Sequence, residues 1–472
     1  MIVRQRIKIA TIIAAILFST SLVIILLPNV LEAQKDDIQV INNFILNNAT
    51  EPSIAYDSKL NKTFSVFFRT LNGSTNLYMM QSGDNGISFS NLTRVNSMEG
   101  DTNNSGIAPP IRFSDNGDIY VGWIRIEPTE KFWGIGDLRL AISIDGGASF
   151  EKTIKPAKNE SISEKLYADL AISNNGTILI PYVDNDLVTI NNSAINYNTD
   201  EIDWKTQINI LRSNDNGKSF QKLVLDKEGC QCCDIATTKG LDGEIYFSWR
   251  TSNRTDVTMN DFADKYIEDW KKSDYFDDKN AINQGLIEVP IYSTTRDILV
   301  SHTTDNGKGL EYSKPVEVQE RNWIMNGCPS TGPGMQFSQD GILHVTYFTG
   351  NGTNGPGYYY TYSEDRGDTF KNPIPIHVAD FVAITHTNMD LNVDSNNNVW
   401  ISFVTAPDEA HNNLESYSKN LNIVVIRYGE IVDEKIFESK TISSPSLTST
   451  NNSTLLSYSN GEDVQIISMA VT

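Results

Sequence analysis

The most reactive side chains in this sequence of 472 residues belong to four cysteines, three of which are almost adjacent. They stand in the segment Cys230-Gln-Cys232-Cys233, and the fourth is Cys328. Disulfides are the usual state of cysteines in an exported chain. Two bridges would use all four thiols, and a bridge from Cys328 to the 230–233 segment would tie two distant parts of the chain together.

The same cysteines also suit a metal site. Cys-x-Cys-Cys is a compact set of thiolates, which copper and zinc accept as ligands, and Cys328 with His386 would complete the coordination. The spacing matches no common structural zinc motif. A redox-active thiol pair is the third possibility, and the sequence leaves all three open.

Three arginines are the candidate ligand-binding residues. Arg69 and Arg250 end predicted strands at equivalent positions of a repeat, and Arg296 stands beside Asp297. A planar guanidinium binds a carboxylate through two parallel hydrogen bonds, so these arginines could hold an acidic ligand. Arg250, Arg296 and Asp297 are also the candidate catalytic residues. Alternatively the arginines form structural ion pairs, which is favoured for Arg69, and Arg296 pairs with Asp297.

The elements that position these residues follow from a short internal repeat. It reads Ser or Thr, any residue, Asp, any residue, Gly, two residues, then an apolar or aromatic side chain. An Asp at the start of a turn accepts hydrogen bonds from the following backbone, and Gly supplies the positive φ. We call each copy an Asp-box turn and expect its Asp to be structural rather than catalytic. The five turns are centred on Asp84, Asp145, Asp215, Asp365 and, in a weaker copy, Asp305.

A second repeat interleaves with the Asp-box turns. It is a polar turn followed by a strand in which aromatic and β-branched residues alternate, the pattern of a half-buried strand. Together the two repeats give units of roughly 60 residues with four strands each, the size of a propeller blade. We therefore predict an all-β propeller with six clear blades and a possible seventh, closed by an N-terminal strand. The strands of the second repeat lie near 62–69, 117–123, 176–183, 243–249, 341–347 and 397–404, and those of the possible seventh blade near 38–45, 453–457 and 463–471.

In such a propeller the four cysteines fall on one face. The Asp-box turn joins the third and fourth strands, so the connection from each outermost strand to the next innermost strand emerges on the opposite face. Residues 230–233 and Cys328 stand in two of these connections. Arg69 and Arg250 should point to the same face, where the central channel opens. The sequence therefore places a ligand site there.

One segment interrupts the repeat. Between residues 256 and 285, Met259, Phe262, Tyr266 and Trp270 have the spacing of one helical face. This spacing predicts a short helical insertion lying over one face of the propeller. An irregular surface excursion is the alternative.

The N-terminus predicts export. Arg4, Arg6 and Lys8 precede an uncharged apolar run over residues 9–27, long enough to cross a bilayer. Residues 1–34 are therefore a signal peptide or a membrane anchor, and residues 35–472 are the extracytoplasmic propeller, secreted or held at the cell surface. Glycosylation sequons agree with export; they begin at Asn48, Asn61, Asn72, Asn91, Asn159, Asn175, Asn253 and Asn351. The net charge of −21 argues against a nucleic-acid partner.

The Asp-box turns resemble those of the sialidase-like superfamily of BNR-repeat propellers over nearly the whole exported part. Cys230-Gln-Cys232-Cys233, Thr295-Arg296-Asp297-Ile298 and Gly327-Cys328-Pro329 resemble a subgroup of exported sialidase-like proteins that carry this cysteine signature. A working sialidase is expected to have three carboxylate-binding arginines, a Tyr–Glu nucleophile pair and an Asp acid. The Phe/Tyr-Arg-Ile-Pro motif of the first arginine is absent, and Ile111-Arg112-Phe113 does not match it.

Two functions follow from these observations. The first is an exported, surface-anchored propeller whose cysteine-rich site binds a glycan, a small molecule or a metal, with copper or zinc as the metal. The second is an exo-sialidase-type glycoside hydrolase acting on extracellular glycans. If the protein is an enzyme, it is a sialidase-like hydrolase or a metal or redox enzyme.

Overall fold

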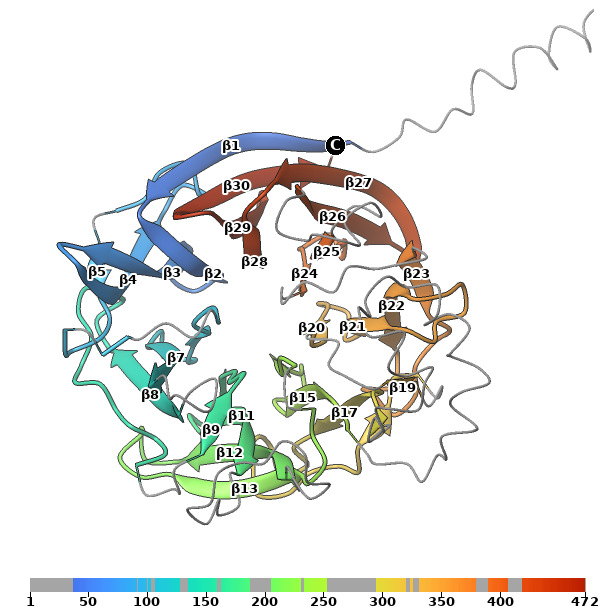
Figure 1. Ribbon diagram of the computed structural model, residues 1–472, viewed down its shortest axis with the longest axis horizontal. Coiled ribbons are helices and arrows are strands. Elements are labelled where there is room, and N and C mark those ends of the chain that lie inside the picture. Colours follow the sequence, from blue (N-terminus) through green and yellow to red (C-terminus); the bar gives the residue numbers. More distant parts are fainter. Residues whose placement is uncertain are drawn as a thin grey trace, which may run out of the picture.

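A computed structural model shows a ring of seven β-sheets around a central channel (Figure 1). All regular elements among the described residues are strands. The described residues are 37–90, 92–99, 101–102, 107–127, 135–158, 163–186, 205–230, 233–252, 294–319, 323–325, 331–378, 389–405 and 418–471. The protein is therefore a seven-bladed propeller, and the seventh blade that the sequence left open is present.

The first three blades use the N-terminal half of the chain, each running outward from the channel. Blade 1 contains β2 (Ala49–Asp57), β3 (Lys62–Leu71), β4 (Ser74–Ser82) and β5 (Thr93–Arg94). Blade 2 contains β6 (Ile111–Phe113), β7 (Ile119–Glu127) and β8 (Ile135–Ser143). Blade 3 contains β10 (Ala171–Ile172), β11 (Ile178–Asp186), β12 (Lys205–Ser213) and β13 (Gln221–Asp226), with β9 (Glu164–Leu166) also pairing with β11.

The next three blades repeat this order. Blade 4 contains β14 (Ala236–Lys239), β15 (Ile245–Arg250), β17 (Ile298–His302) and β18 (Val316–Glu317). Blade 5 contains β20 (Gly334–Phe337), β21 (Leu343–Thr349), β22 (Gly357–Ser363) and β23 (Ile374–Val378). Blade 6 contains β24 (Asp390–Val393), β25 (Val399–Thr405), β26 (Lys419–Arg427) and β27 (Glu430–Ser439). A separate two-stranded sheet pairs β16 (Thr294–Thr295) with β19 (Ile324–Met325).

Blade 7 closes the ring with both ends of the propeller chain. Its three inner strands are C-terminal: β28 (Ile442–Ser449), β29 (Thr454–Asn460) and β30 (Asp463–Val471). Its outermost strand is the N-terminal β1 (Ile38–Asn47), which runs antiparallel to β30 (Figure 1). Lys435 Nζ of blade 6 donates to the Ile38 carbonyl over 2.9 Å, and the Ile38 amide donates to Asp433. β1 therefore completes the sheet of blade 7 and also joins this blade to blade 6.

The core lies between the blades rather than inside one sheet. One cluster joins Phe64 and Val66 of blade 1 to Val121 and Trp123 of blade 2. Another joins Phe67 of blade 1 to the C-terminal strands of blade 7. Because each blade buries its faces against two neighbours, no blade has a complete core of its own.

The Asp-box turns have the hydrogen bonds that their residue types predict. In the first, Ser82 Oγ accepts from the Gly86 amide over 2.9 Å, and Asp84 Oδ1 accepts from the Ser88 amide over 2.9 Å. Gly86 has φ of 82°. In the turn of Asp215, hydrogen bonds from Ser219 lower the pKa of the carboxyl to about 2. The Asp side chains of these turns are engaged locally and lie away from the channel lining.

The weak copy uses an additional partner. Asp305 accepts from the amides of Gly309 and Leu310 over 2.9 and 2.7 Å. In the first turn a Ser hydroxyl accepts from the amide of the equivalent glycine, Gly86. Here the Gly307 amide donates to Glu244 instead, over 2.9 Å. Glu244 belongs to the turn before β15, so the weaker motif is completed from a neighbouring hairpin.

Two expectations fall on parts of the chain that are not described. The predicted helical insertion over 256–285 lies within the gap from 253 to 293, and the signal peptide or anchor at 1–34 precedes residue 37. Among the described residues no helix has the length and apolarity needed to cross a bilayer.

Removing β1 should weaken the whole ring, because the outer edge of β30 and its apolar face then lose their partner. We expect a chain that begins at Asn48 to unfold about 5 °C or more below one that begins at Asp37. Differential scanning calorimetry of both chains measures the difference. Equal unfolding temperatures would show that β1 does not close the ring.

Candidate functional site

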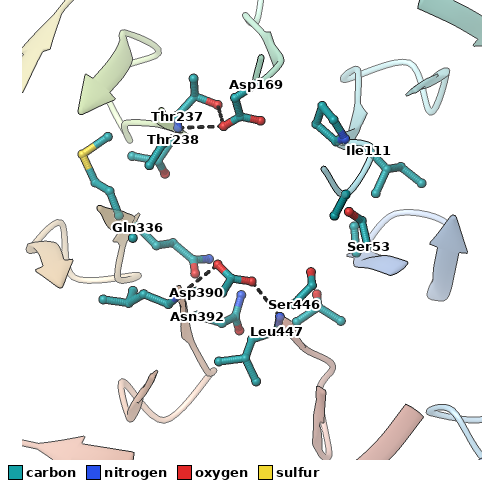
Figure 2. A pocket seen from close by; sticks show the side chains of 18 of the residues that line it. Ser53, Ile111, Asp169, Thr237, Thr238, Gln336, Asp390, Asn392, Ser446 and Leu447 are labelled. Atoms are coloured by element: carbon teal, nitrogen blue, oxygen red, sulfur yellow. Dashed lines mark hydrogen bonds between the residues drawn. The ribbon is translucent and has the colours of Figure 1, made fainter. Parts of the chain in front are cut away.

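The channel at the centre of the ring contains a cavity of about 400 Å³. All seven innermost strands, or the residues just before them, contribute to its wall. Figure 2 shows the wall from close by, with Gln336 and Asp390 extending into the central space. Among the polar residues of the wall are Ser53, Asp169, Asp234, Gln336, Asp390 and Ser446.

Two aspartates of the wall hold neighbouring blades together in the same way. Asp169 Oδ2 accepts from the amide and the hydroxyl of Thr237 in blade 4, both over 2.8 Å (Figure 2). Asp390 Oδ2 accepts from the Leu447 amide in blade 7 over 2.7 Å (Figure 2). In each case Oδ1 accepts from the amide of the next residue, Leu170 or Leu391.

Uncharged side chains make the same kind of bond elsewhere around the ring. Ser446 Oγ in blade 7 accepts from the Ile54 amide in blade 1 over 3.3 Å. Gln336 Oε1 in blade 5 accepts from the Val393 amide in blade 6 over 3.0 Å. An innermost strand is a sheet edge whose amides lack a strand partner, so a side chain of the preceding blade satisfies them. We call these bonds inter-blade latches.

Asp169 forms an ion pair with an arginine of blade 2. Arg112 Nη2 lies 2.7 Å from Oδ1 and 3.0 Å from Oδ2 of Asp169. Arg112 Nη1 also donates to the Ile111 carbonyl over 2.9 Å. The guanidinium is therefore already committed to a carboxylate of the protein.

Asp234, just before β14, has a different environment. Burial raises the pKa of Asp234 to about 7, and the charge of Asp169 adds to the shift. Burial also raises the pKa of Asp390 to about 6, against the hydrogen bonds from Leu447 and Leu391. One channel therefore holds an aspartate that forms an ion pair with an arginine and a second carboxyl group, that of Asp234, whose pKa is raised to about 7. A carboxyl group with a pKa near neutral is suited to act as an acid in catalysis.

The cysteine segment lies directly before this acid in the sequence. Cys230 Sγ and Cys233 Sγ are 3.1 Å apart and buried, and Cys233 precedes Asp234. Arg296 Nη1 lies 3.3 Å from Cys230 Sγ and 3.1 Å from Ser252 Oγ. The structure thus places Arg296 beside the cysteine segment.

The metal site stays a prediction. Cys232, Cys328 and His386 lie outside the described residues, and copper or zinc binding by the full set is untested. Among the residues with described positions, no three His, Cys, Asp or Glu side chains come together as a metal site requires.

Arg250 is occupied by backbone carbonyls of its own blade and of the next blade. Its guanidinium donates to the carbonyls of Thr331 and Phe348 over 3.0 and 2.8 Å and to that of Arg296. It also lies 5.3 Å from the ring centre of Trp323. The side chain is 1% exposed, so its described contacts are structural. Ligand binding by Arg250 stays a prediction without a contact that supports it.

Asp297 and Arg69 are likewise separate from the channel. Asp297 Oδ1 accepts from the Trp323 amide over 3.1 Å, and burial raises the pKa of Asp297 to about 6. A cavity beside Arg250, Arg296 and Asp297 measures about 10 Å³, room for about one water molecule. Arg69 lies two residues before the end of β3 in blade 1, whereas Arg250 ends β15 in blade 4. Arg250 and Arg296 share the wall of the small cavity, and Arg69 lines neither that cavity nor the channel.

The channel carboxyls were missed by the sequence reasoning, although the sequence contains a signal for two of them. Ala168-Asp169-Leu170 directly precedes the innermost strand of blade 3, and Met389-Asp390-Leu391 stands at the start of the innermost strand of blade 6. Asp169 bonds to the backbone of Pro181, and Asp390 lies opposite Ser402, so the two occupy equivalent positions of the repeat. Aligning the innermost strands would have found them.

Comparison with known proteins extends the description of the fold. No family model and no curated protein matches the chain. A polysaccharide lyase of family PL25, an ulvan lyase, is 11% identical, with 92% of this chain and 96% of that chain covered and a TM-score of 0.51. A protein of unknown function from Dyadobacter fermentans is 11% identical, with 92% of this chain and 99% of that chain covered and a TM-score of 0.46. The Hadza microbial sialidase Hz136 is also 11% identical, with 85% of this chain and 74% of that chain covered and a TM-score of 0.43. The likeness to the ulvan lyase shows the propeller fold.

Replacing Asp234 by Asn should stabilise the protein at alkaline pH. The pKa of Asp234 is raised from about 4 in the unfolded chain to about 7 in the folded chain. The group's contribution to stability is therefore complete below pH 4 and is lost as the pH rises through 7. The carboxyl borders the channel, so solvent reduces the effect. We expect the free energy of unfolding of Asp234→Asn to exceed that of wild type by about 1–2 kcal/mol at pH 8, with little difference at pH 4.

Urea unfolding at several pH values checks this expectation. Asp368→Asn, a change at an exposed Asp-box turn, is the control and should show no such pH dependence. A difference between Asp234→Asn and wild type that stays constant from pH 4 to pH 8 would contradict the raised pKa.

Proposed function

We propose that the protein is an exported propeller that binds a glycan in its central channel and hydrolyses a glycosidic bond there. The observation that carries the proposal is the presence in one channel of Asp169, which forms an ion pair with Arg112, and of Asp234, whose pKa is raised to about 7. Glycoside hydrolysis uses two carboxyl groups, one as a proton donor and one as a carboxylate.

The size and polarity of the channel support a sugar ligand. A cavity of about 400 Å³ is within the range of small-molecule sites. Its wall offers side-chain hydroxyl, amide and carboxyl groups from several blades, such as Ser446, Gln336 and Asn392 (Figure 2). A ligand with hydroxyl groups on every side could bond to several blades at once.

In this proposal the protonated Asp234 donates its proton to the glycosidic oxygen as the bond to the leaving sugar breaks. The Asp169 carboxylate stabilises the positive charge that develops on the sugar ring. Arg112 and Thr237 hold Asp169 in place through their hydrogen bonds. A water molecule then attacks the sugar to complete hydrolysis and loses a proton to solvent. Asp234 takes up a proton from solvent and is ready for the next cycle.

The charge of the channel favours neutral or amino sugars. Asp169, Asp234 and Asp390 line it, whereas its cations are Arg112, bonded to Asp169, and the exposed Lys239, which lies 3.2 Å from Asp115. A sialic acid carboxylate would meet these acids without a free arginine among the described residues of the wall. This charge argues against the exo-sialidase alternative. The ulvan lyase of similar fold has been solved with a -[GlcA(1-4)Rha3S]- oligosaccharide, which supports a glycan ligand in general.

Export to the cell surface is part of the proposal and rests on the sequence. The basic start and apolar run within residues 1–34 support a signal peptide or anchor, and the sequons support an extracytoplasmic location. An extracellular glycan would then reach the channel without crossing a membrane. The cysteine-rich site as a ligand or metal site remains the second candidate.

We expect the full-length protein to release reducing ends from at least one neutral or amino-sugar oligosaccharide of a panel of arabino-, xylo-, manno- and chito-oligosaccharides. Since Asp234 must be protonated, the rate should fall as the pH rises above about 7. Asp234→Asn should lower kcat by about 100-fold or more while leaving glycan affinity nearly unchanged. Reducing-end assays and calorimetric titration measure the two quantities.

The control Asp368→Asn should keep full activity. Sialyllactose belongs in the same panel as a test of the sialidase alternative. That alternative would be favoured if the protein hydrolysed sialyllactose, if Arg296→Ala abolished this activity and if Asp234→Asn kept it. Absence of both binding and release across the panel would overturn the proposal.

A further inference from the structure

Two thiols that the proposed hydrolysis does not use are in direct contact. Cys230 Sγ and Cys233 Sγ lie 3.1 Å apart, and their side chains are 1% and 2% exposed. They form a Cys-x-x-Cys pair in the connection between β13 and β14. Among the four cysteines, these are the two whose positions the structure describes.

The backbone on both sides fixes this contact. The Cys230 amide donates to the Arg250 carbonyl at the end of β15 over 2.8 Å, and the Gly229 amide donates to the Thr206 carbonyl of β12 over 3.2 Å. Cys233 is followed by Asp234 and the buried Ile235, which leads into β14. The sulfurs are therefore held between blade 3 and blade 4 rather than on a loose loop.

The surroundings of the sulfurs carry positive charge. Arg296 Nη1 lies 3.3 Å from Cys230 Sγ, and Ser252 Oγ accepts a second bond from the same nitrogen over 3.1 Å. Burial raises the pKa of the Cys233 thiol, while the charges of Arg250 and Arg296 oppose the shift. A guanidinium donor stabilises a thiolate and repels a divalent cation, so this environment suits thiol chemistry better than metal binding.

We propose that Cys230 and Cys233 are a dithiol–disulfide couple in which Arg296 positions Cys230 as the attacking thiolate. The oxidant is a small-molecule disulfide such as glutathione disulfide. Cys230 Sγ attacks one sulfur of the oxidant, its S–S bond breaks, and one thiolate leaves. Cys233 then loses its proton, its sulfur attacks Cys230 Sγ, and the second thiolate leaves. Two protein thiols are oxidised, and one small-molecule disulfide is reduced to two thiols.

The burial of both sulfurs adds a kinetic property. Because both sulfurs are buried in the folded chain, we expect the bridge to form most readily before folding is complete. The bridge would also restrain Cys233, which directly precedes the channel residue Asp234. The proposed couple does not depend on the proposed hydrolysis.

Peptide mapping of the full-length wild-type protein tests the pairing without any substitution. The protein is equilibrated in unfolding buffer with reduced and oxidised glutathione, refolded, alkylated and digested. The tryptic peptide 228–239 contains three cysteines. We expect it to contain one internal bridge from Cys230 to Cys233, with Cys232 alkylated. A bridge from this peptide to Cys328, a bridge involving Cys232, or four reduced thiols with stoichiometric copper or zinc would overturn the couple.

A second measurement tests the role of Arg296. Because the guanidinium stabilises the reduced, thiolate form, Arg296→Gln should raise the equilibrium constant for oxidation by glutathione disulfide by about tenfold. Arg296→Lys, which keeps the charge, should stay near the wild-type value. If both variants lower only the unfolding temperature and leave the equilibrium constant unchanged, Arg296 is structural and the positioning role is wrong.

Discussion

The exposed edge of each innermost strand is the constraint on which this propeller depends. A strand at the channel has no strand partner on its inner side, so its amides must bond to something else. Asp169 and Asp390 supply carboxylates to the next blade, and Ser446 supplies a hydroxyl. The channel wall is polar for this structural reason before any ligand is considered. A site for a hydroxyl-rich ligand could then arise from groups that the fold already requires.

Much of the architecture follows from local sequence. The Asp-box turns at Asp84 and Asp215 contain the bonds that a Ser, an Asp and a positive-φ Gly predict, because all the partners lie within a few residues. A strand near Ile38 that closes a possible seventh blade was also predicted, and β1 pairs with β30 in that place. The number of blades, six or seven, could not be decided from the sequence. Blade 7 has no Asp-box turn and draws its strands from both ends of the chain.

The candidate site was harder to predict because its residues act over long sequence separations. Asp169 bonds to Thr237, and Arg112 reaches Asp169 from blade 2. Local patterns cannot give such pairs. Arg250 looked like a ligand-binding residue because it ends a strand at the channel face. Its carbonyl partners, Thr331 and Phe348, come from the next blade, and only the packing of two blades reveals them.

The environments of the channel carboxyls depend on one another. Carboxylates that share one cavity repel, and a neighbouring cation or a raised pKa reduces this repulsion. Arg112 forms an ion pair with Asp169. Burial raises the pKa of Asp234, and the charge of Asp169 adds to the shift. Asp169, which joins blades 3 and 4 through Thr237, therefore also contributes to the environment of the neighbouring acid. A residue that the fold requires for its latch thus adds to the raised pKa on which the proposed proton donor depends.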